Sequence, residues 1–272
     1  MKIPFYKMQG TGNDFIVINN LELRYTGEQL SELAQQVCQQ RISVGSDAVM
    51  AVDFPEHGGD FRMRFYNADG SEAEMCGNGA RCIARYAYEH QLAPAEMTIE
   101  TIAGDVKAWR LDERLYKVQL NDPSVVTFDR AFSEQLTVDY IELGDPGIPH
   151  LVVPYPQLAT TDLNELRALA KSLRFWDELP KGANVNFYEL TEDEVIVRTY
   201  ERGVEDFTLA CGTGSGSTAY ALVKKQLTTK QLVTLNVLGG TLEVEVADDG
   251  LYLIGDTNIV IEGLIRDEDL QL

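Results

Sequence analysis

The feature that most constrains the fold of this chain is an internal repeat, with an offset of about 135 residues between matching positions. The segment Cys76-Gly-Asn-Gly79 matches Cys211-Gly-Thr-Gly214, and Arg64-Phe-Tyr66 matches Arg198-Thr-Tyr200. Ala103-Gly104 and Leu115-Tyr116 meet Gly239-Gly240 and Leu251-Tyr252 at nearly the same offset. A repeat that covers so much of a 272-residue chain predicts two α/β halves of similar topology.

Each half carries a helix signal ahead of its Cys-Gly-x-Gly segment. Apolar residues recur at helical spacing in 26–41 and in 162–173. Both segments begin with a capping signal, Thr26 with Gln29 and Asp162 with Glu165. The stretch "GNDFIVI" near the start also resembles "NVNFYEL" at 184–190, although at a different offset.

The remaining patterned segments predict strands, and a further helix follows each Cys-Gly-x-Gly turn. The expected strands are 14–19, 48–53, 61–66, 97–101, 105–110, 115–120, 184–190, 194–200, 241–247 and 251–254. We predict a domain of residues 1–125 that carries Cys76 and a domain of residues 126–272 that carries Cys211, joined around 122–150. The last strand of the chain is expected to return to the first domain.

Charge and hydropathy exclude several classes of function. The formal charge is −20, with 23 basic against 43 acidic residues, so we expect no nucleic-acid partner. The acids are scattered, which is typical of a soluble surface. No apolar run approaches the length of a membrane span and the N-terminus lacks a hydrophobic signal region, so we expect no membrane partner and a cytoplasmic location.

The cysteines and histidines show no metal-ligand spacing. Cys38, Cys76, Cys82 and Cys211 form no C-x-x-C pair, and His57, His90 and His150 are not spaced as ligands relative to them. No metal site is therefore predicted. Cys38 lies on an amphipathic helix face, and it and Cys82 are interpreted as core residues.

Cys76 and Cys211 call for a different interpretation, because each precedes a Gly-x-Gly at the start of a helix. The exposed N–H groups of such a turn bind carboxylates, and a thiol placed there becomes more acidic. Two such thiols on opposite sides of one molecule could invert a carbon next to a carboxylate, one removing a proton and the other supplying one. The alternative is that both cysteines serve packing alone.

At these residues the chain resembles the diaminopimelate epimerase family. The resemblance spans nearly the whole length and is carried by "GTGNDFIVI", "NADGSEAEMCGNGARC", "NVNFYEL", "ERG" and "ACGTG". It implies an α/β (α+β) fold of two pseudo-symmetric halves, each a mainly antiparallel sheet around a central helix, with the active site in the cleft between them. It also implies an isomerase that acts without pyridoxal phosphate, metal or other cofactor on a small amino-acid substrate. A homodimer is a further candidate assembly.

The family's roles transfer to individual positions of this sequence. Cys76 and Cys211 resemble the acid and base, with His150 and Glu201 as the groups that help to set their protonation. The remaining positions resemble substrate-binding residues: Asn13, Asn67, Gly77, Asn78, Asn184, Arg202, Gly212 and Thr213. Without the resemblance, Asn67 is a turn residue, Asn13 a strand-entry cap and Arg202 half of a surface ion pair.

Two departures from the family pattern concern the substrate. The family has Gly-Asn-Pro-His where this chain has "GDPGIPH", which puts Ile148 in place of an asparagine and removes a hydrogen bond. The segment "ERGVEDFTLAC" is one residue longer than usual. Diaminopimelate is the expected substrate, and a racemase for another amino acid, such as histidine, is the alternative. A non-catalytic binding module on the same fold is the alternative from another class.

Overall fold

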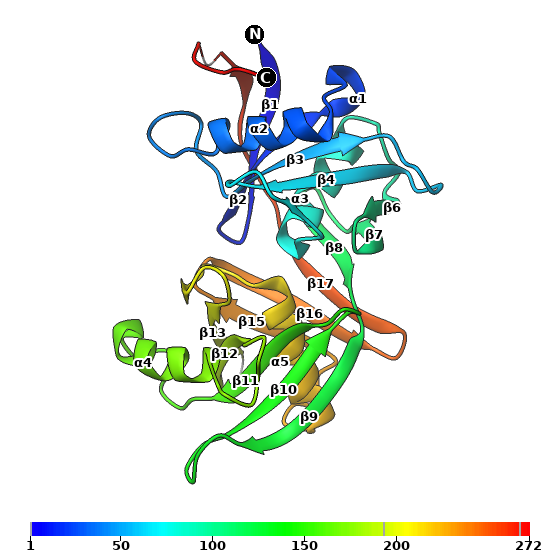
Figure 1. The fold of residues 1–272 in the computed structure, drawn as a ribbon. Coiled ribbons are helices and arrows are strands. Elements are labelled where there is room, and N and C mark those ends of the chain that lie inside the picture. The colour runs from blue at the N-terminus through cyan, green and yellow to red at the C-terminus, as the bar shows by residue number, and fades with distance from the viewer. Residues whose placement is uncertain (1, 193, 267) are drawn as a thin grey trace. The chain divides into compact units, whose positions relative to one another are not determined.

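The structure, a computed structural model, describes residues 2–192, 194–266 and 268–272 and divides the chain into two compact units. One unit runs up to Val118 and resumes at Gly255, and the other comprises Gln119–Ile254. The domain prediction placed a single boundary between 125 and 126. The first unit takes the C-terminal segment because β18 (Asn258–Ile265) pairs antiparallel with β1 (Ile3–Gly10) (Figure 1).

The first unit is a mixed sheet in which most neighbouring strands are antiparallel. Its other strands are β2 (Asn13–Asn19), β3 (Ala48–Asp53), β4 (Phe61–Asn67), β5 (Glu72–Ala73), β6 (Glu96–Thr101), β7 (Gly104–Arg110) and most of β8 (Leu115–Leu120). β2 pairs with β1 and runs parallel to β3, β3 is antiparallel to β4, and β4 runs parallel to β6. The parallel pairs occur where a helix separates two strands along the chain.

The second unit repeats this order. Its strands are β9 (Pro123–Ala131), β10 (Thr137–Leu143), β11 (Ile148–Pro154), β12 (Asn184–Leu190), β13 (Val195–Glu201), β14 (Asp206–Phe207), β15 (Leu232–Val237), β16 (Gly240–Ala247) and most of β17 (Gly250–Asp256). β10 lies between β9 and β11, β11 runs parallel to β12, and β13 runs parallel to β15. The predicted fold class is confirmed, but the segment 122–150, expected to be a connection, contains β9, β10 and the start of β11.

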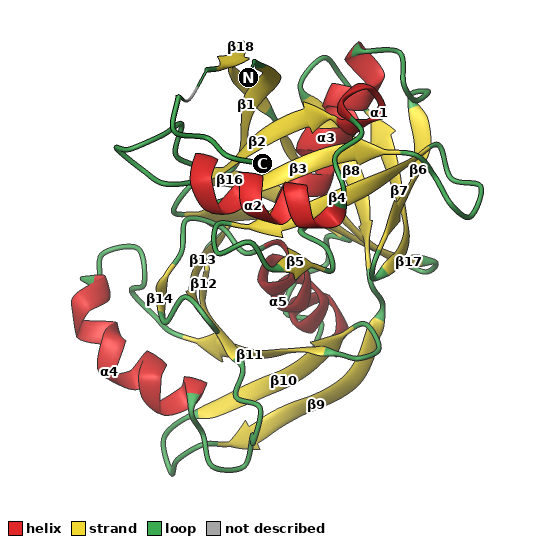
Figure 2. Ribbon diagram, turned by 45° about the horizontal axis from the view of Figure 1, so that its top comes forward, coloured by secondary structure: helices red, strands yellow, loops and turns green. Residues whose placement is uncertain are grey.

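Each sheet carries a helix on either face (Figures 1 and 2). In the first unit α2 (Gly27–Val37) packs on one face and α3 (Gly77–Glu89) on the other, while α4 (Leu163–Arg174) and α5 (Gly212–Lys224) do the same in the second. Alternation along the strands explains both contacts. Ile16 and Ile18 join the core beneath α2, whereas Met50 faces the first turn of α3. A short helix, α1 (Asn20–Leu23), follows β2.

The ends of the helices follow from their caps. Thr26 and Gln29 form the expected capping box at the start of α2, and Asp162 accepts a hydrogen bond from the Asn164 N–H at the start of α4. The helix predicted over 26–41 stops at Val37, and Arg41 has a φ of 70°. A residue in this left-handed region interrupts helical geometry, so the chain turns there.

Strand registers correct one feature of the repeat. Ile16 of β2 lies opposite Val49 of β3, and Leu151 of β11 lies opposite Val185 of β12, with all four side chains in the core beneath α2 or α4. β2 is therefore equivalent to β11, and β12 is equivalent to β3. The likeness of "GNDFIVI" to "NVNFYEL" therefore relates two strands that are not equivalent in the two units.

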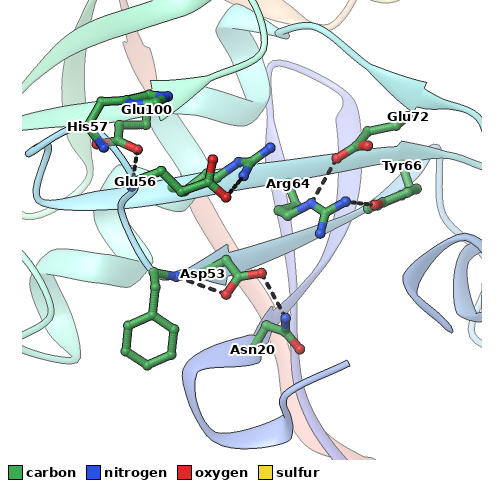
Figure 3. Close-up of polar contacts among 10 residues, drawn as sticks. Asn20, Asp53, Glu56, His57, Arg64, Tyr66, Glu72 and Glu100 are labelled. Carbon is green, nitrogen blue, oxygen red and sulfur yellow. Dashed lines mark hydrogen bonds and ion pairs between the residues drawn. The ribbon is translucent and has the colours of Figure 1, made fainter. Parts of the chain in front are cut away.

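A buried carboxylate fixes the loop that follows β3 (Figure 3). Glu100, only 3% exposed, accepts hydrogen bonds from the backbone N–H groups of Glu56, His57 and Gly59 at 2.6, 2.7 and 2.8 Å. Asp53 joins the loop to α1 by accepting from Asn20 at 2.9 Å. The loop between β3 and β4 is thus held by side chains rather than by strand pairing.

Within the described ranges, no helix is both long enough and apolar enough to cross a bilayer.

Candidate active site

Cys76 is the N-cap residue of α3, the central helix of the first unit. Its backbone is extended, with φ −135° and ψ 120°, and its side chain is half-buried. Gly77 and Asn78, the first two helical residues, are buried. The helix begins close against the sheet, because a Cβ on Gly79 would lie 2.8 Å from the Met50 sulfur. The sequence therefore places a thiol beside the N–H groups of a helix start.

The turn between β1 and β2 is built against this helix start. Asn78 Nδ2 donates to Asn13 Oδ1 at 2.7 Å, and Asn13 Nδ2 donates to Asp47 at 3.0 Å. A Cβ on Gly10 would lie 3.2 Å from the Asn78 carbonyl oxygen. The structure thus brings together two of the predicted binding residues. The "GTGND" stretch predicts no particular function by itself. In the structure it supplies Gly10 and Asn13, which lie against Asn78 at the helix start.

Asn67 lies at the end of β4 and forms the turn that a sequence "NADGS" predicts. Its Nδ2 donates to Ser71 Oγ at 3.0 Å, and its backbone carbonyl accepts from the Gly70 N–H at 2.9 Å. Its side chain is half-buried. The turn role is present, and the substrate role of Asn67 stays a prediction.

Cys211 is the N-cap residue of α5, at the same place in the second unit. Its backbone is again extended, with φ −121° and ψ 111°, and its Sγ accepts a hydrogen bond from the Gly214 N–H at 3.4 Å. The Thr213 hydroxyl lies 3.6 Å from the same sulfur, and Gly212 is buried. A Cβ on Gly214 would lie 2.1 Å from Asn186 Oδ1, so only glycine fits at this position.

His150 is fully buried in β11 and held by Asn186 of β12. Its Nδ1 lies 3.2 Å from Asn186 Nδ2, which also donates to the Leu151 carbonyl at 3.0 Å, while Asn186 Oδ1 accepts from Thr199. Burial, followed by the nearby Arg202 charge, lowers the pKa of His150 to about 3. The imidazole is therefore neutral at neutral pH, with its proton on Nε2 because Nδ1 accepts. No partner for Nε2 occurs among the described residues.

Asn186 was not among the predicted site residues. The signal for it is the second asparagine of "NVN", two residues beyond Asn184 and therefore on the same face of the strand. Only the packing of β12 against α5 shows that this face points toward the helix start.

Asn184, Arg202 and Glu201 lie at the ends of neighbouring strands of the second unit. Asn184 Oδ1 accepts from the Arg202 backbone N–H at 2.8 Å, and Arg202 Nη1 donates to the Lys181 carbonyl at 3.3 Å. Glu201 is the half-buried last residue of β13, and Asn184 lies opposite His150 in the β11–β12 pair. The structure thus gathers these four predicted residues in one part of the unit. Ile148, half-buried, begins β11.

The other two cysteines are core residues, as expected. Cys38 is 4% exposed and Cys82 is fully buried, and burial raises the pKa of each thiol to about 12. Neither is a nucleophile or a base at neutral pH. Among the described residues there is also no cluster of three or more His, Cys, Asp or Glu side chains suited to a metal ion.

Solved structures show which fold this chain has. A phenazine biosynthesis protein of the PhzF family from Bacillus anthracis matches with a TM-score of 0.73 at 17% identity, covering 97% of this chain and 99% of that one. A hydroxyproline epimerase from Agrobacterium vitis matches with a TM-score of 0.70 at 16% identity, covering 99% and 94%. The protein therefore has the two-halved fold of the PhzF and proline racemase-type epimerases.

Sequence comparison then identifies the family. The model of the diaminopimelate epimerase family matches residues 5–126 and 144–260. A diaminopimelate epimerase from Aquifex aeolicus is 38% identical, with 99% of this chain and all of the relative covered, and one from Archaeoglobus fulgidus is 34% identical, with 100% and 99% covered. The chain belongs to the diaminopimelate epimerase family, whose members are isomerases.

Proposed function

We propose that this protein converts LL-diaminopimelate to the meso isomer, with Cys76 and Cys211 as the two acid–base groups and without a cofactor. The observation that carries the proposal is the same thiol placement in each unit, an extended N-cap residue before a buried glycine at the start of the central helix. The family membership supplies the substrate class.

The proposed reaction moves one proton off and one proton onto the same carbon. The thiolate of one cysteine removes the α-proton, and the thiol of the other donates a proton to the opposite face, so the carbon inverts. After one turnover the first cysteine is a thiol and the second a thiolate, and the reverse reaction uses them in exchanged roles. The overall proton count is unchanged.

Backbone amides at the two helix starts stabilise the intermediate. As the proton leaves, negative charge builds on the α-carboxylate, and the N–H groups at Gly77–Asn78 and at Gly212–Thr213 are suited to receive it. Neutral His150 and half-buried Glu201, both in the second unit, would help to set the protonation of the two thiols. Because the imidazole of His150 is neutral at neutral pH, it adds no positive charge to the second unit.

Polar side chains of both units would hold the rest of the substrate. Asn13, Asn67 and Asn184 offer amide groups, and Arg202 offers a guanidinium suited to a distal carboxylate. This assignment places the protein in lysine and peptidoglycan precursor synthesis in the cytoplasm, with a homodimer as the proposed assembly.

One observation favours a second substrate. Ile148 starts β11 where the family has an asparagine, and an isoleucine cannot donate to the polar end of diaminopimelate. A racemase of another amino acid, histidine included, would keep the two thiols and replace the distal contacts.

The test is solvent exchange in heavy water without pyridoxal phosphate, followed by NMR. LL-Diaminopimelate, L-histidine and a panel of other L-amino acids are offered separately to the wild type and to the Cys76→Ala and Cys211→Ala variants. We expect deuterium at the α-carbon of diaminopimelate with appearance of the meso isomer, and loss of isomerisation in both variants.

Other outcomes are equally decisive. Exchange with a different amino acid alone would transfer the mechanism to a racemase. Substantial isomerisation by either cysteine variant would contradict the two-thiol scheme. Absence of exchange with every substrate, together with ligand binding that survives in both variants, would favour the non-catalytic binding module.

A further inference from the structure

Helix α3 buries an arginine directly behind the Cys76 helix start. Arg81 is 0% exposed, and its Nη2 donates to Thr11 Oγ1 at 3.1 Å and to Asn78 Oδ1 at 2.9 Å. Its Nε and Nη1 have no hydrogen-bond partner among the described residues. A buried guanidinium is costly unless an anion or a full set of acceptors compensates it, so its charge needs an explanation.

Three groups that can carry negative charge interact electrostatically with Arg81: Cys82, Cys76 and Asp256. Burial raises the pKa of Cys82 to about 12, so this thiol stays neutral. Asp256 forms an ion pair with Arg114, and its side chain is 55% exposed, so solvent screens it. Arg81 is hydrogen-bonded to Asn78, two residues after Cys76 at the same helix start, so the thiolate of Cys76 is the remaining anion of the three that can balance the buried charge.

Other charged groups of the first unit have ion-pair or hydrogen-bond partners of their own. Lys7 of β1 forms an ion pair with Asp14 of β2 at 2.7 Å, and Asp47, just before β3, accepts a hydrogen bond from the Asn13 amide. One turn further along α3, Arg85 pairs with Glu89 and donates to the Thr257 carbonyl. Burial lowers the pKa of Arg81 to about 10, which still leaves it protonated at neutral pH.

The second unit has no such cation at the equivalent position. Arg81 follows Cys76 by as many residues as Gly216 follows Cys211 in the printed sequence. A Cβ on Gly216 would lie 2.7 Å from the Leu120 side chain, so α5 has no room for a side chain there. Two helix starts with the same backbone therefore differ in one buried positive charge.

We infer that Arg81 is a positioning residue that makes the two thiols unequal: its charge favours the thiolate at Cys76 in the resting enzyme, and its hydrogen bonds hold Asn78 and the Thr11 turn in place. This inference rests on the proposed two-thiol function. Cys76 then supplies the resting base and Cys211 the resting acid. A proton that leaves Cys76 goes to solvent before substrate binds.

The first test measures thiolate formation without catalysis. Iodoacetamide labelling of Cys76 is followed against pH by peptide mass spectrometry in the Cys211→Ser protein, with Arg81 intact or changed to Met or Lys. We expect the midpoint to rise by about one pH unit in Arg81→Met and to stay near the parent value in Arg81→Lys, which keeps the charge. Arg85→Met is the matched control from the same helix and should not move the midpoint.

The second test uses the pH profile of isomerisation with both cysteines intact. We expect Arg81→Met to shift the acidic fall of kcat/KM to higher pH and to lower kcat/KM near pH 7 by about tenfold or more. Arg81→Lys should return this fall to the wild-type pH. Thr11→Val removes one hydrogen bond of Arg81 but no charge, so it should lower the rate without moving this fall.

These tests distinguish a wrong role for Arg81 from a wrong function for the protein. A midpoint in Arg81→Met that equals that of Arg85→Met overturns the role of Arg81, whatever the substrate. A shifted midpoint in a protein that isomerises no amino acid retains the electrostatic role and rejects the proposed function. Where Arg81→Met does not fold, Arg81→Gln is compared with Arg81→Lys, and equal midpoints overturn the inference.

Discussion

Asn13 and Ile148 occupy the same position in the two units. The registers of β2 with β3 and of β11 with β12 make Ile16 equivalent to Leu151, and three residues earlier stand Asn13 and Ile148. The first unit therefore offers an amide at the start of this strand, and the second offers an aliphatic side chain. We expect this difference to affect substrate choice rather than the acid–base chemistry.

Changing Ile148 to Asn should favour diaminopimelate. A hydrogen bond to a polar substrate group is worth about 1 kcal/mol, which corresponds to a gain of roughly fivefold in kcat/KM for LL-diaminopimelate. Initial rates with LL-diaminopimelate and L-histidine check this expectation, and Ile148→Val is the control of similar shape. Equal effects of Asn and Val on every substrate would contradict the proposed contact.

His150 makes the stability of the protein sensitive to acid. Its pKa is about 3 in the folded protein and near 6.5 in an unfolded chain, so the unfolded state binds the extra proton. The stability that depends on the neutral imidazole is complete above about pH 6.5 and declines as the pH falls toward 3. His150→Gln should therefore lose less stability than the wild type between pH 6.5 and 4, measured by urea unfolding.

The control for this measurement is His57→Gln, because His57 is exposed. Its stability should follow the wild-type curve. A parallel decline of the wild type and His150→Gln would show that the buried imidazole does not control the acid sensitivity.

At the scale of elements, both central helices start at a cysteine that acts as N-cap, a residue type that is not a strong cap. Packing compensates for this, since Gly79 and Gly214 let each helix start approach its sheet within a distance that no side chain tolerates. The loop after β3 is a second case, where Glu100 replaces strand pairing.

Glu100→Gln should loosen the loop of residues 54–60. Burial alone would raise the pKa of Glu100, but three backbone N–H bonds outweigh it and hold the pKa below the ordinary value. The carboxylate therefore stabilises the fold above the unfolded-state pKa of about 4.3, and this stabilisation is lost as the pH falls through the lower folded-state pKa. We expect a lower thermal unfolding midpoint for Glu100→Gln at pH 7, and a smaller difference from the wild type near pH 3.

Glu96→Gln, an exposed position on the same strand, is the matched control and should leave the midpoint unchanged. Faster amide exchange confined to 54–60 in Glu100→Gln would locate the effect. A midpoint equal to that of Glu96→Gln would contradict the role of the carboxylate.

At the scale of the whole molecule, the proposed mechanism requires that Cys76 and Cys211 reach opposite faces of one carbon. Thiols that close should form a disulfide under mild oxidation with little movement. We expect diamide to abolish isomerisation, dithiothreitol to restore it, and peptide mapping to identify a Cys76–Cys211 disulfide. The Cys38→Ser and Cys82→Ser variants should behave like the wild type, because both thiols are buried.

Oxidised protein that keeps full activity would contradict the convergence of the two thiols. A disulfide that involves Cys82 would instead show that α3 opens under the conditions used.

The repeat, the helix starts and most of the strands can be predicted from local signals along the chain. Cys-Gly-x-Gly before a helical pattern and period-2 alternation are local signals, and local sterics and capping enforce them. Candidate site residues can be predicted in the same way, because the motifs "MCGNGARC" and "NVNF" contain Cys76, Asn78 and Asn184. The segment 122–150 is predicted as a connection, whereas the structure places β9 and β10 in it, and β9 is largely exposed.

The partners of these residues cannot be predicted from such local signals, because they depend on how distant segments pack. Asn186 is hydrogen-bonded to His150, and buried Arg81 is hydrogen-bonded to Thr11, although each pair is distant in sequence. The equivalence of β2 with β11 likewise follows only from the strand registers. No local pattern distinguishes Arg81 from Arg85, four residues later on the same helix. Burial separates them, because a helix presents one face to its sheet and the other to solvent, and the choice of face depends on the whole sheet.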